Sequence, residues 1–311
     1  MTVSDPAYIS YIIPAFNEES SIAETLHSII EGEIKFPYEI IVVDHNSTDK
    51  TVEIASALGA SVINAKGGTI ASVRNLGVLH SKGNLIVFLD ADISLTEQWF
   101  KALPLVVEQL LADPMIVTGS HCNAPDNGNW IEQNWFNNYV HEVDTDNLGT
   151  GHMIMSRKLF DSINGFDESL VTGEDYSFCM SVLASGGKII NNKDLYVVHR
   201  DYPENSWQFI QREAWHGMGD VTSLNAVIRS KVALAALIFM MLHAIVFIAV
   251  FVPAVPFTVA PLGLLAIVGL LLFSSWKKYG HCSYHVILIN SAIFYLYFIG
   301  RSLSYLKSSH R

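Results

Sequence analysis

The feature that most limits how this chain can fold is an uncharged apolar run at residues 232–252, VALAALIFMMLHAIVFIAVFV. A helix needs about 20 apolar residues to cross the hydrocarbon core of a bilayer, and this run has that length. After the proline-interrupted segment PAVPFTVAP, a second apolar run follows, and we expect helices near 232–252 and 254–273. A buried core helix can be equally apolar, but two consecutive runs with basic flanks favour a membrane hairpin. The flanking residues are Arg229, Lys231, Lys277 and Lys278.

A third apolar stretch near residues 286–306 is more ambiguous. It contains Asn290, and the basic residues Arg301, Lys307 and Arg311 lie at its end or beyond it. If it crossed a membrane, these charges would end outside, against the usual bias of basic residues towards the cytoplasm. Crossing the bilayer and lying along its interface both remain open for this segment.

Charge divides the chain into two physically different parts. Residues 229–311 carry seven Lys plus Arg and no acidic residue, so residues 1–228 carry the other twelve basic residues and all 30 acidic ones. We expect a front domain at 1–228 and a membrane region at 229–311, in a multi-pass protein of the cytoplasmic membrane. Basic flanks at the hairpin indicate that the front domain lies in the cytoplasm. Its acidic charge disfavours nucleic acid as a partner.

The front part alternates short apolar strands with amphipathic helices. The expected strands are residues 8–13, 39–43, 61–64 and 85–89, and the expected helices begin near 22, 51 and 70. Ser21 and Glu24 have the spacing of a capping box at the first of these helices. Strands and helices that alternate at this spacing predict an α/β fold with a mostly parallel sheet covered on both faces.

Polar side chains follow several of these strands directly. Asn17 and Glu18 follow the first strand, Asp44 follows the second, and Asp90 and Asp92 follow the strand at 85–89. In open α/β sheets, ligands bind at the carboxyl ends of the strands. The sequence therefore predicts a nucleotide site at this edge.

Three interpretations of Asp90-Ala91-Asp92 compete. The aspartates could cap a helix that begins near Thr96. They could be a nucleophile and its acid partner in a phosphatase-type site. Against this, the motif lies in the middle of the chain, with no glycine-aspartate metal loop after it. Finally, they could hold Mg²⁺ or Mn²⁺ against a sugar-nucleotide diphosphate, because hard carboxylate oxygens bind these ions.

Several ordered motifs together resemble those of the family 2 glycosyltransferases. They are IIPAFNEE, VVDHNSTDKT, SVRNLG, FLDAD, INGFDESLVTGEDYSF and REAWHG, and they cover roughly residues 8–220. The resemblance implies the GT-A fold of nucleotide-diphospho-sugar transferases. The apolar tail is similar to that of membrane-attached members, which act beside a lipid-linked acceptor.

The resemblance also implies roles for residues at the donor site. Asp92 would be the direct ligand of the metal cofactor, Mn²⁺ or Mg²⁺. Asp44 would contact the nucleotide, and Arg74 would support the base or the diphosphate. The residues bordering the nucleobase or ribose would be Pro14, Phe16 and Glu18, and Asp90 and Ala91 would face the ribose. Many members have a second acidic residue where this chain has His45, which leaves the identity of the base open.

The family's catalytic base corresponds to Asp175 in TGEDYSF. A sugar hydroxyl is a poor nucleophile, and a carboxylate within hydrogen-bond reach can take its proton as the new bond forms. Direct displacement from the opposite face inverts the anomeric configuration. Glu174 would bind the acceptor or orient the loop. The alternative for both acids is a helix N-terminus, where negative charge is favoured.

Two further residues are candidates by position. His199 lies where some members have an extra metal ligand, although a histidine after a strand can equally be a structural donor. Arg212 could reach the donor diphosphate or could be a cation at the membrane surface. The segment from Gln211 to Trp215, QREAW, does not match the Q-x-x-R-W of processive synthases. We therefore expect transfer of one sugar.

Aromatic residues cluster before the segment GTGHMIMSR. Trp130, Trp135, Phe136 and Tyr139 could stack on a sugar, rest at a lipid interface or pack an amphipathic helix. The role of His152 is equally open.

The main functional hypothesis is a membrane-anchored, inverting, metal-dependent glycosyltransferase of polysaccharide biosynthesis. Its partners would be a nucleotide-diphosphate sugar and a lipid-linked or surface glycan. A variant uses polyprenyl phosphate as the acceptor, which is already ionised. The rival class is a non-catalytic membrane scaffold that keeps the fold only for binding. The sequence does not identify the sugar, because pocket shape determines which hydroxyls are recognised.

Overall fold

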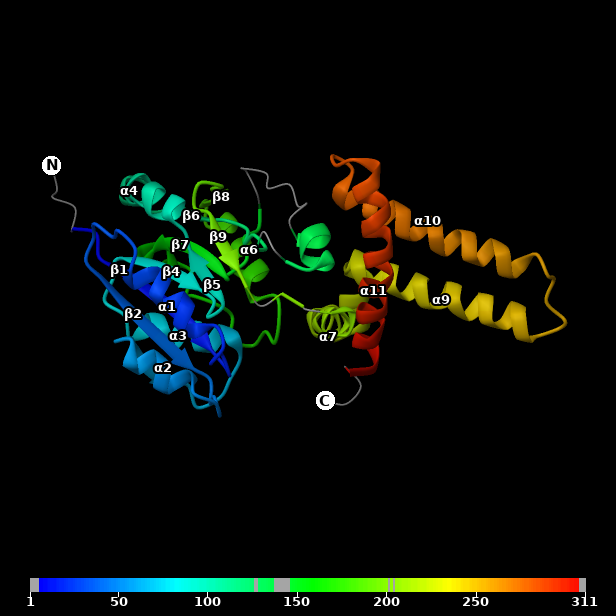
Figure 1. Cartoon of the computed structure of the whole chain (residues 1–311), viewed down its shortest axis with the longest axis horizontal. Helices are drawn as coiled ribbons and strands as arrows, with labels where there is room; N and C mark the ends of the chain where they lie inside the picture. Colours follow the sequence, from blue (N-terminus) through cyan, green and yellow to red (C-terminus); the bar gives the residue numbers. More distant parts are fainter. Residues whose placement is uncertain (1–5, 126–127, 137–145, 201, 204, 308–311) are drawn as a thin grey trace. The chain divides into compact units, whose positions relative to one another are not determined.

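A computed structural model describes residues 6–125, 128–136, 146–200, 202–203 and 205–307 (Figure 1). The chain forms two compact units. The first comprises Met1–Pro125 and His141–Asp201, and the second comprises Asp126–Val140 and Tyr202–Arg311.

The first unit is built on a seven-stranded sheet with the order β3-β2-β1-β4-β7-β6-β8. Its strands are β1 (Ile9–Ala15), β2 (Tyr38–Asp44), β3 (Ser61–Asn64), β4 (Leu85–Leu89), β6 (Ile116–Gly119), β7 (His152–Ser156) and β8 (Lys188–Asn191). All neighbouring pairs are parallel except those of β7, which runs antiparallel to both β4 and β6. The predicted mostly parallel sheet is confirmed.

Helices cover both faces of this sheet. They are α1 (Ile22–Ile30), α2 (Thr51–Ala57), α3 (Ile70–Leu79), α4 (Glu97–Ala112), α5 (Arg157–Ser162) and α6 (Glu174–Ala184). Successive side chains of a strand point to opposite faces. Tyr11 and Ile13 accordingly join the core that contains Trp99 of α4, whereas Ile12 joins the core that contains Phe160 of α5.

Two local predictions are wrong. Ser21 precedes α1, but its side chain makes no capping bond, and its hydroxyl instead donates to the Glu18 carboxylate at 2.8 Å. The aspartates at 90 and 92 do not cap the next helix. The short strand β5 (Ile93–Leu95) intervenes, and Thr96 caps α4 by accepting from the Trp99 amide. This result removes the capping interpretation of Asp90-Ala91-Asp92.

The second unit is helical. It contains the π-helix η1 (Glu132–Phe136), α7 (Ser206–His216), the 3₁₀ turn η2 (Gly219–Val221), α8 (Leu224–Arg229), α9 (Lys231–Phe251), α10 (Val259–Tyr279) and α11 (Tyr284–Lys307). By length and composition, α9, α10 and α11 are each apolar enough to cross a membrane. The three predicted C-terminal apolar helices are therefore present, with α10 beginning at Val259, inside the proline-interrupted segment PAVPFTVAP.

The helix α7 belongs to this second unit and packs closely on α11. Gly300 of α11 allows the approach, since a Cβ there would lie 2.7 Å from the Ile210 carbonyl oxygen of α7. Residues 202–228, which precede the predicted membrane region, thus fold with the apolar helices. The domain boundary at 228/229 stays a prediction about where the membrane begins.

Candidate active site

The ends of β1, β2 and β3 lie side by side at the carboxyl edge of the sheet. Ala15 of β1 pairs with Asp44 of β2, and Asp44 pairs with Asn64 of β3. Asp44 is only 1% exposed, and its carboxylate accepts from the Ser47 amide at 3.2 Å and from Asn64 Nδ2 at 3.5 Å. Its carboxylate therefore closes the loop that follows β2.

The loops after β1 and β2 are joined by hydrogen bonds. Asn17 has a left-handed backbone conformation, with φ 56°, and its Oδ1 accepts from the Thr48 amide at 2.8 Å. The Glu18 amide donates to Thr51 Oγ1 at 2.7 Å. Pro14 is buried within β1, whereas Phe16 is 57% exposed. This arrangement leaves the Phe16 ring accessible to a planar ligand.

Arg74 of α3 joins two carboxylates. Its Nη2 donates to Asp90 Oδ1 and its Nη1 donates to Glu174 Oε1, each at 2.8 Å. The Arg74 side chain is 3% exposed, and Glu174 is 8% exposed. Because a buried carboxylate needs a partner, Arg74 supplies a cation to Glu174, and it also binds the partly exposed Asp90. The predicted contact of Arg74 with a base or diphosphate stays a prediction.

Asp92 and His199 lie side by side. Their Oδ2 and Nε2 atoms are 3.2 Å apart, and both side chains are less than a fifth exposed. The antiparallel pairing of β5 with β9 (Val197–His199) produces this contact, with Ile93 opposite His199. One carboxylate oxygen and one imidazole nitrogen suit Mn²⁺. Across the described residues, no group of three or more His, Cys, Asp or Glu side chains is arranged to hold a metal ion.

Two residues that the sequence did not single out, Thr25 and Gly151, shape the aspartate turn, and the charges of the turn act on a third, Cys122. The Ala91 carbonyl accepts from Thr25 Oγ1 at 2.7 Å, which ties the buried Ala91 to α1. At Gly151, a Cβ would lie 2.9 Å from Asp90 Oδ2, so a larger residue there would displace that carboxylate. Burial and the charges of Asp90 and Asp92 raise the pKa of the Cys122 thiol, which therefore stays protonated.

The two acids at the start of α6 have different surroundings. Glu174 points to Arg74 and to Thr150 Oγ1, the latter at 3.5 Å. Asp175 is half-buried, and its Oδ1 accepts from the Tyr176 amide at 2.7 Å. Both residues lie in the first turn of a helix, where the dipole also favours negative charge. Their roles as catalytic base and orienting residue stay predictions.

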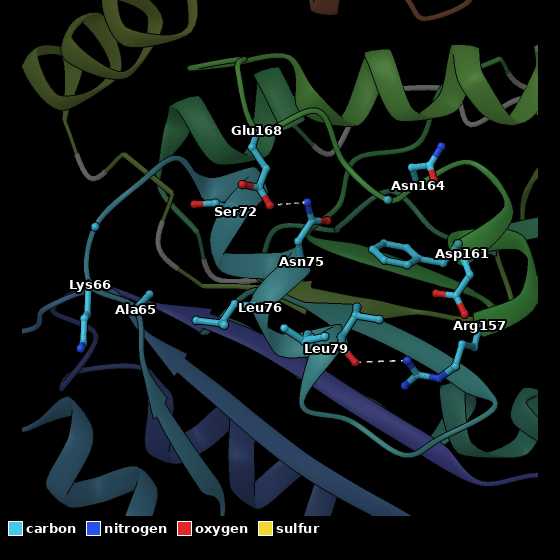
Figure 2. Close-up of a pocket in the computed structure, with 14 residues that line it drawn as sticks. Ala65, Lys66, Ser72, Asn75, Leu76, Leu79, Arg157, Asp161, Asn164 and Glu168 are labelled. Carbon is cyan, nitrogen blue, oxygen red and sulfur yellow. Dashed lines mark hydrogen bonds between the residues drawn. The ribbon is translucent and has the colours of Figure 1, made fainter.

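A groove of about 690 Å³ runs beside α3, on residues outside the predicted site (Figure 2). Within it, Asn75 Nδ2 donates to Glu168 Oε1 and to the Phe166 carbonyl, each at 2.9 Å. The Phe166 amide donates back to Asn75 Oδ1 at 3.0 Å. Adjacent residues of α3 therefore hold both the loop before α6 and, through Arg74, the first residue of α6.

His152 is a core residue. Trp99 Nε1 donates to His152 Nε2 at 2.8 Å, and His152 Nδ1 lies 3.0 Å from Ser120 Oγ. Burial lowers the pKa of this imidazole to about 3, so it is neutral near pH 7. The question left open by the sequence is answered in favour of packing.

The remaining candidates lie in the second unit. The Arg212 guanidinium lies 4.9 Å from the centroid of the Phe136 ring, and Phe136 stacks on Tyr202 at 4.0 Å. Trp135 is buried, which agrees with helix packing, whereas Trp130 is 47% exposed. Tyr139 lies outside the described residues. A contact of Arg212 with the donor diphosphate stays a prediction.

Comparisons with known proteins agree with this architecture. Residues 10–163 match the model of Glycosyl transferase family 2. Over 193 residues the chain is 24% identical to the poly(ribitol-phosphate) beta-N-acetylglucosaminyltransferase TarS of Staphylococcus aureus, a match that covers 58% of this chain and 33% of TarS. Over 92 residues it is 37% identical to the 4,4'-diaponeurosporenoate glycosyltransferase of Staphylococcus aureus, covering 28% of this chain and 24% of that protein.

One solved structure has a similar fold over nearly the whole length of this chain. The mannosyltransferase PcManGT of Pyrobaculum calidifontis, solved with GDP-Man and Mn²⁺, has a TM-score of 0.60 and 19% identity, covering 97% of this chain and 87% of that one. The chain therefore belongs to glycosyl transferase family 2, and its sheet unit has the GT-A fold. It spans about a third of the length of the TarS proteins that it matches.

Proposed function

We propose that this protein is a membrane-anchored glycosyltransferase that moves one sugar from a nucleotide-diphosphate donor to a hydroxyl of a lipid-linked or surface glycan, with inversion. The observation that most supports this proposal is the Arg74 bridge between Asp90 and Glu174. Because Asp92 and Asp175 follow the bridged acids closely in the chain, the bridge ties the predicted metal ligand and the predicted base to one arginine. Transfer requires that the donor and the acceptor be held in a fixed position relative to each other.

Asp92 and His199 would hold the divalent ion, Mn²⁺ or Mg²⁺. They fit such an ion because a carboxylate oxygen and an imidazole nitrogen lie 3.2 Å apart at the sheet edge. When bound, the ion would neutralise charge on the departing diphosphate. Structural relatives solved with Mn²⁺ support a divalent metal, among them the PcManGT complex.

The protein's own groups would bind the donor and activate the acceptor. Asp175 would take the proton of the acceptor hydroxyl, and Glu174 would keep the loop oriented through Arg74. Arg212 would approach the diphosphate. The residues proposed to border the nucleotide are Pro14, Phe16, Glu18, Asp44, Asp90 and Ala91.

The names of two relatives support the proposed class of acceptor. The TarS name specifies poly(ribitol-phosphate), and the name of the second relative specifies 4,4'-diaponeurosporenoate. We therefore propose a glycan or lipid-linked acceptor at the membrane, with polyprenyl phosphate as the alternative. The hairpin α9–α10 would anchor the protein, with its basic flanks and the sheet unit in the cytoplasm.

Purified protein and labelled sugar nucleotides test this function. UDP-, GDP-, dTDP- and CMP-sugars are screened with and without Mn²⁺ for a raised melting temperature, because a ligand of the folded state stabilises it. The donor that raises the melting temperature is then supplied in radiolabelled form with Mn²⁺. We expect release of the sugar to water or to added membrane glycolipid. If neither hydrolysis nor transfer occurs with any donor, the protein is a scaffold.

A further inference from the structure

The length of the apolar helix α11 does not show whether it crosses the membrane or lies along its surface. It is the least apolar of the three long C-terminal helices. It also has an exposed apolar stripe at helical spacing, which comprises Tyr284, Leu288, Ala292 and Tyr295. A helix with one packed face and one exposed apolar stripe suits either a membrane crossing or an interfacial position.

The start of α11 is held against the end of α10. The Cys282 amide, just before α11, donates to the Tyr279 carbonyl at 2.8 Å. Ser275 Oγ of α10 donates to the Ile287 carbonyl at 2.7 Å. The first turn of α11 therefore lies beside the last turns of α10.

The end of α11 is held against the start of α9 and against α7. Tyr305 OH donates to the Ala233 carbonyl, in the first turn of α9, at 2.9 Å. Ser304 Oγ donates to the Ala214 carbonyl of α7 at 2.8 Å. Between the two ends, the Phe298 ring lies 5.5 Å from that of Phe239.

These contacts determine the direction of α11. The helices α9 and α10 pack as a hairpin, so the start of α9 and the end of α10 lie at the same end of it. Both ends of α11 are bonded to that end of the hairpin. Figure 1 shows α11 running across α9 and α10, with the tip of the hairpin extending beyond it. A third crossing would instead carry the end of α11 about 30 Å away, to the tip.

The charge on α11 has partners on the same side. Arg301 Nη2 lies 3.1 Å from Glu213 of α7, and Arg301 Nη1 lies 3.3 Å from Asp220. Both acids precede α9 in the chain. The charge of Arg301 is therefore paired with acids that precede the first membrane helix. With α11 on that side, Arg301 agrees with the usual bias of basic residues towards the cytoplasm.

We propose that α11 is not a third crossing but a helix that lies along the bilayer surface at the base of the hairpin, with its apolar stripe against lipid. Its C-terminus then lies on the side of the membrane from which α9 starts. The partner is the bilayer itself. Lys231 and Lys277, at the same end of the hairpin, suit anionic lipid headgroups. The inference depends on the membrane anchoring proposed above and on no step of the catalytic mechanism.

Labelling of single cysteines with a membrane-impermeant maleimide tests the topology in sealed vesicles. The three native cysteines are replaced by serine or alanine, and one cysteine is introduced in each variant. Leu105→Cys in α4 marks the side of the sheet unit, Phe257→Cys marks the hairpin tip, and Leu306→Cys marks the end of α11. These three side chains are 72%, 88% and 65% exposed.

We expect Leu306→Cys to react from the same side as Leu105→Cys, and Phe257→Cys to react only from the other side. If Leu306→Cys reacts together with Phe257→Cys, α11 crosses and the proposal is wrong. If all three react from one side, the hairpin does not cross, and the proposed anchoring fails together with this inference. Sugar transfer by the same variants reports separately on the proposed activity.

A polarity-sensitive fluorophore at Leu288→Cys tests the contact with lipid. In proteoliposomes we expect a blue-shifted emission relative to the same fluorophore at Leu105→Cys. Equal, water-like emission at the two positions would contradict a lipid-facing stripe.

Discussion

Arg74 and Glu174 are 100 residues apart in the chain and form a buried ion pair, with Nη1 and Oε1 separated by 2.8 Å. The same guanidinium binds Asp90. Removing one partner of a buried pair leaves an uncompensated charge, which costs more than the pair itself contributes. The bridge is therefore both a structural element and the frame of the candidate site.

Replacing Arg74 by methionine should lower the free energy of unfolding by about 3 to 5 kcal/mol, because Glu174 would remain buried without a cation. The measurement is the denaturation midpoint in detergent. Adding Glu174→Gln to this variant should recover part of the loss, since the unpaired charge is removed.

Lys101→Met is the matched control for a lost cation. Lys101 pairs with Glu97 on the surface, where both side chains are more than two-thirds exposed, and its loss should change stability by less than about 1 kcal/mol. Equal losses for the two variants would contradict a special contribution of the Arg74 bridge.

Asp92→Asn should abolish the Mn²⁺ dependence of donor binding and slow transfer by about 100-fold or more, because the proposed ion contributes several kcal/mol of charge stabilisation. Donor-induced thermal shifts with and without Mn²⁺ measure the first effect. His199→Gln should raise the Mn²⁺ concentration needed for half-maximal activity. Asp113→Asn, which removes an exposed carboxylate paired with Lys188, should change neither quantity.

Asp175→Asn distinguishes the two acceptor classes. With a hydroxyl acceptor, transfer should fall by about 100-fold to 10,000-fold, since no group would take the proton. Donor-induced thermal shifts should remain, because donor binding is assigned to other residues. Transfer close to that of the wild type would instead indicate an acceptor that is already ionised, such as a polyprenyl phosphate.

His152 should make stability depend on pH. Its pKa is about 3 in the folded state and 6.5 as a model value, so protons bind preferentially to the unfolded chain between these values. The stabilisation is complete above pH 6.5 and is lost as the pH falls, by about 2 kcal/mol between pH 7 and pH 5. In His152→Gln, which starts less stable, that part of the pH dependence should be absent. An unchanged pH dependence would show that His152 does not cause it.

Local pattern was enough to predict the strands that carry the site. The predicted bounds 61–64 and 85–89 are those of β3 and β4. Residues 85–89 are all buried, and β-branched and aromatic residues suit a buried strand. The capping box failed for a tertiary reason. The loops after β1 and β2 are bonded together, and Ser21 turns to Glu18 within that arrangement.

The contacts within the site could not be predicted from pattern. Asp92 meets His199 only because β5 pairs with β9, and each of these strands has three residues, too few to show a periodicity. The Arg74 bridge likewise depends on which helix lies over which strand. The motifs predicted which residues have roles, but tertiary structure determines that Arg74 binds two acids.

The antiparallel strand β7 has a consequence for synthesis of the protein. It lies between β4 and β6 in the sheet, although both are made before it. While the nascent chain leaves the ribosome, the hydrogen-bonding groups of β4 on that side have no neighbour until Ser156 has emerged. Unpaired strand edges promote aggregation. The interval during which residues 90–156 are translated is thus when a chaperone would have most to protect.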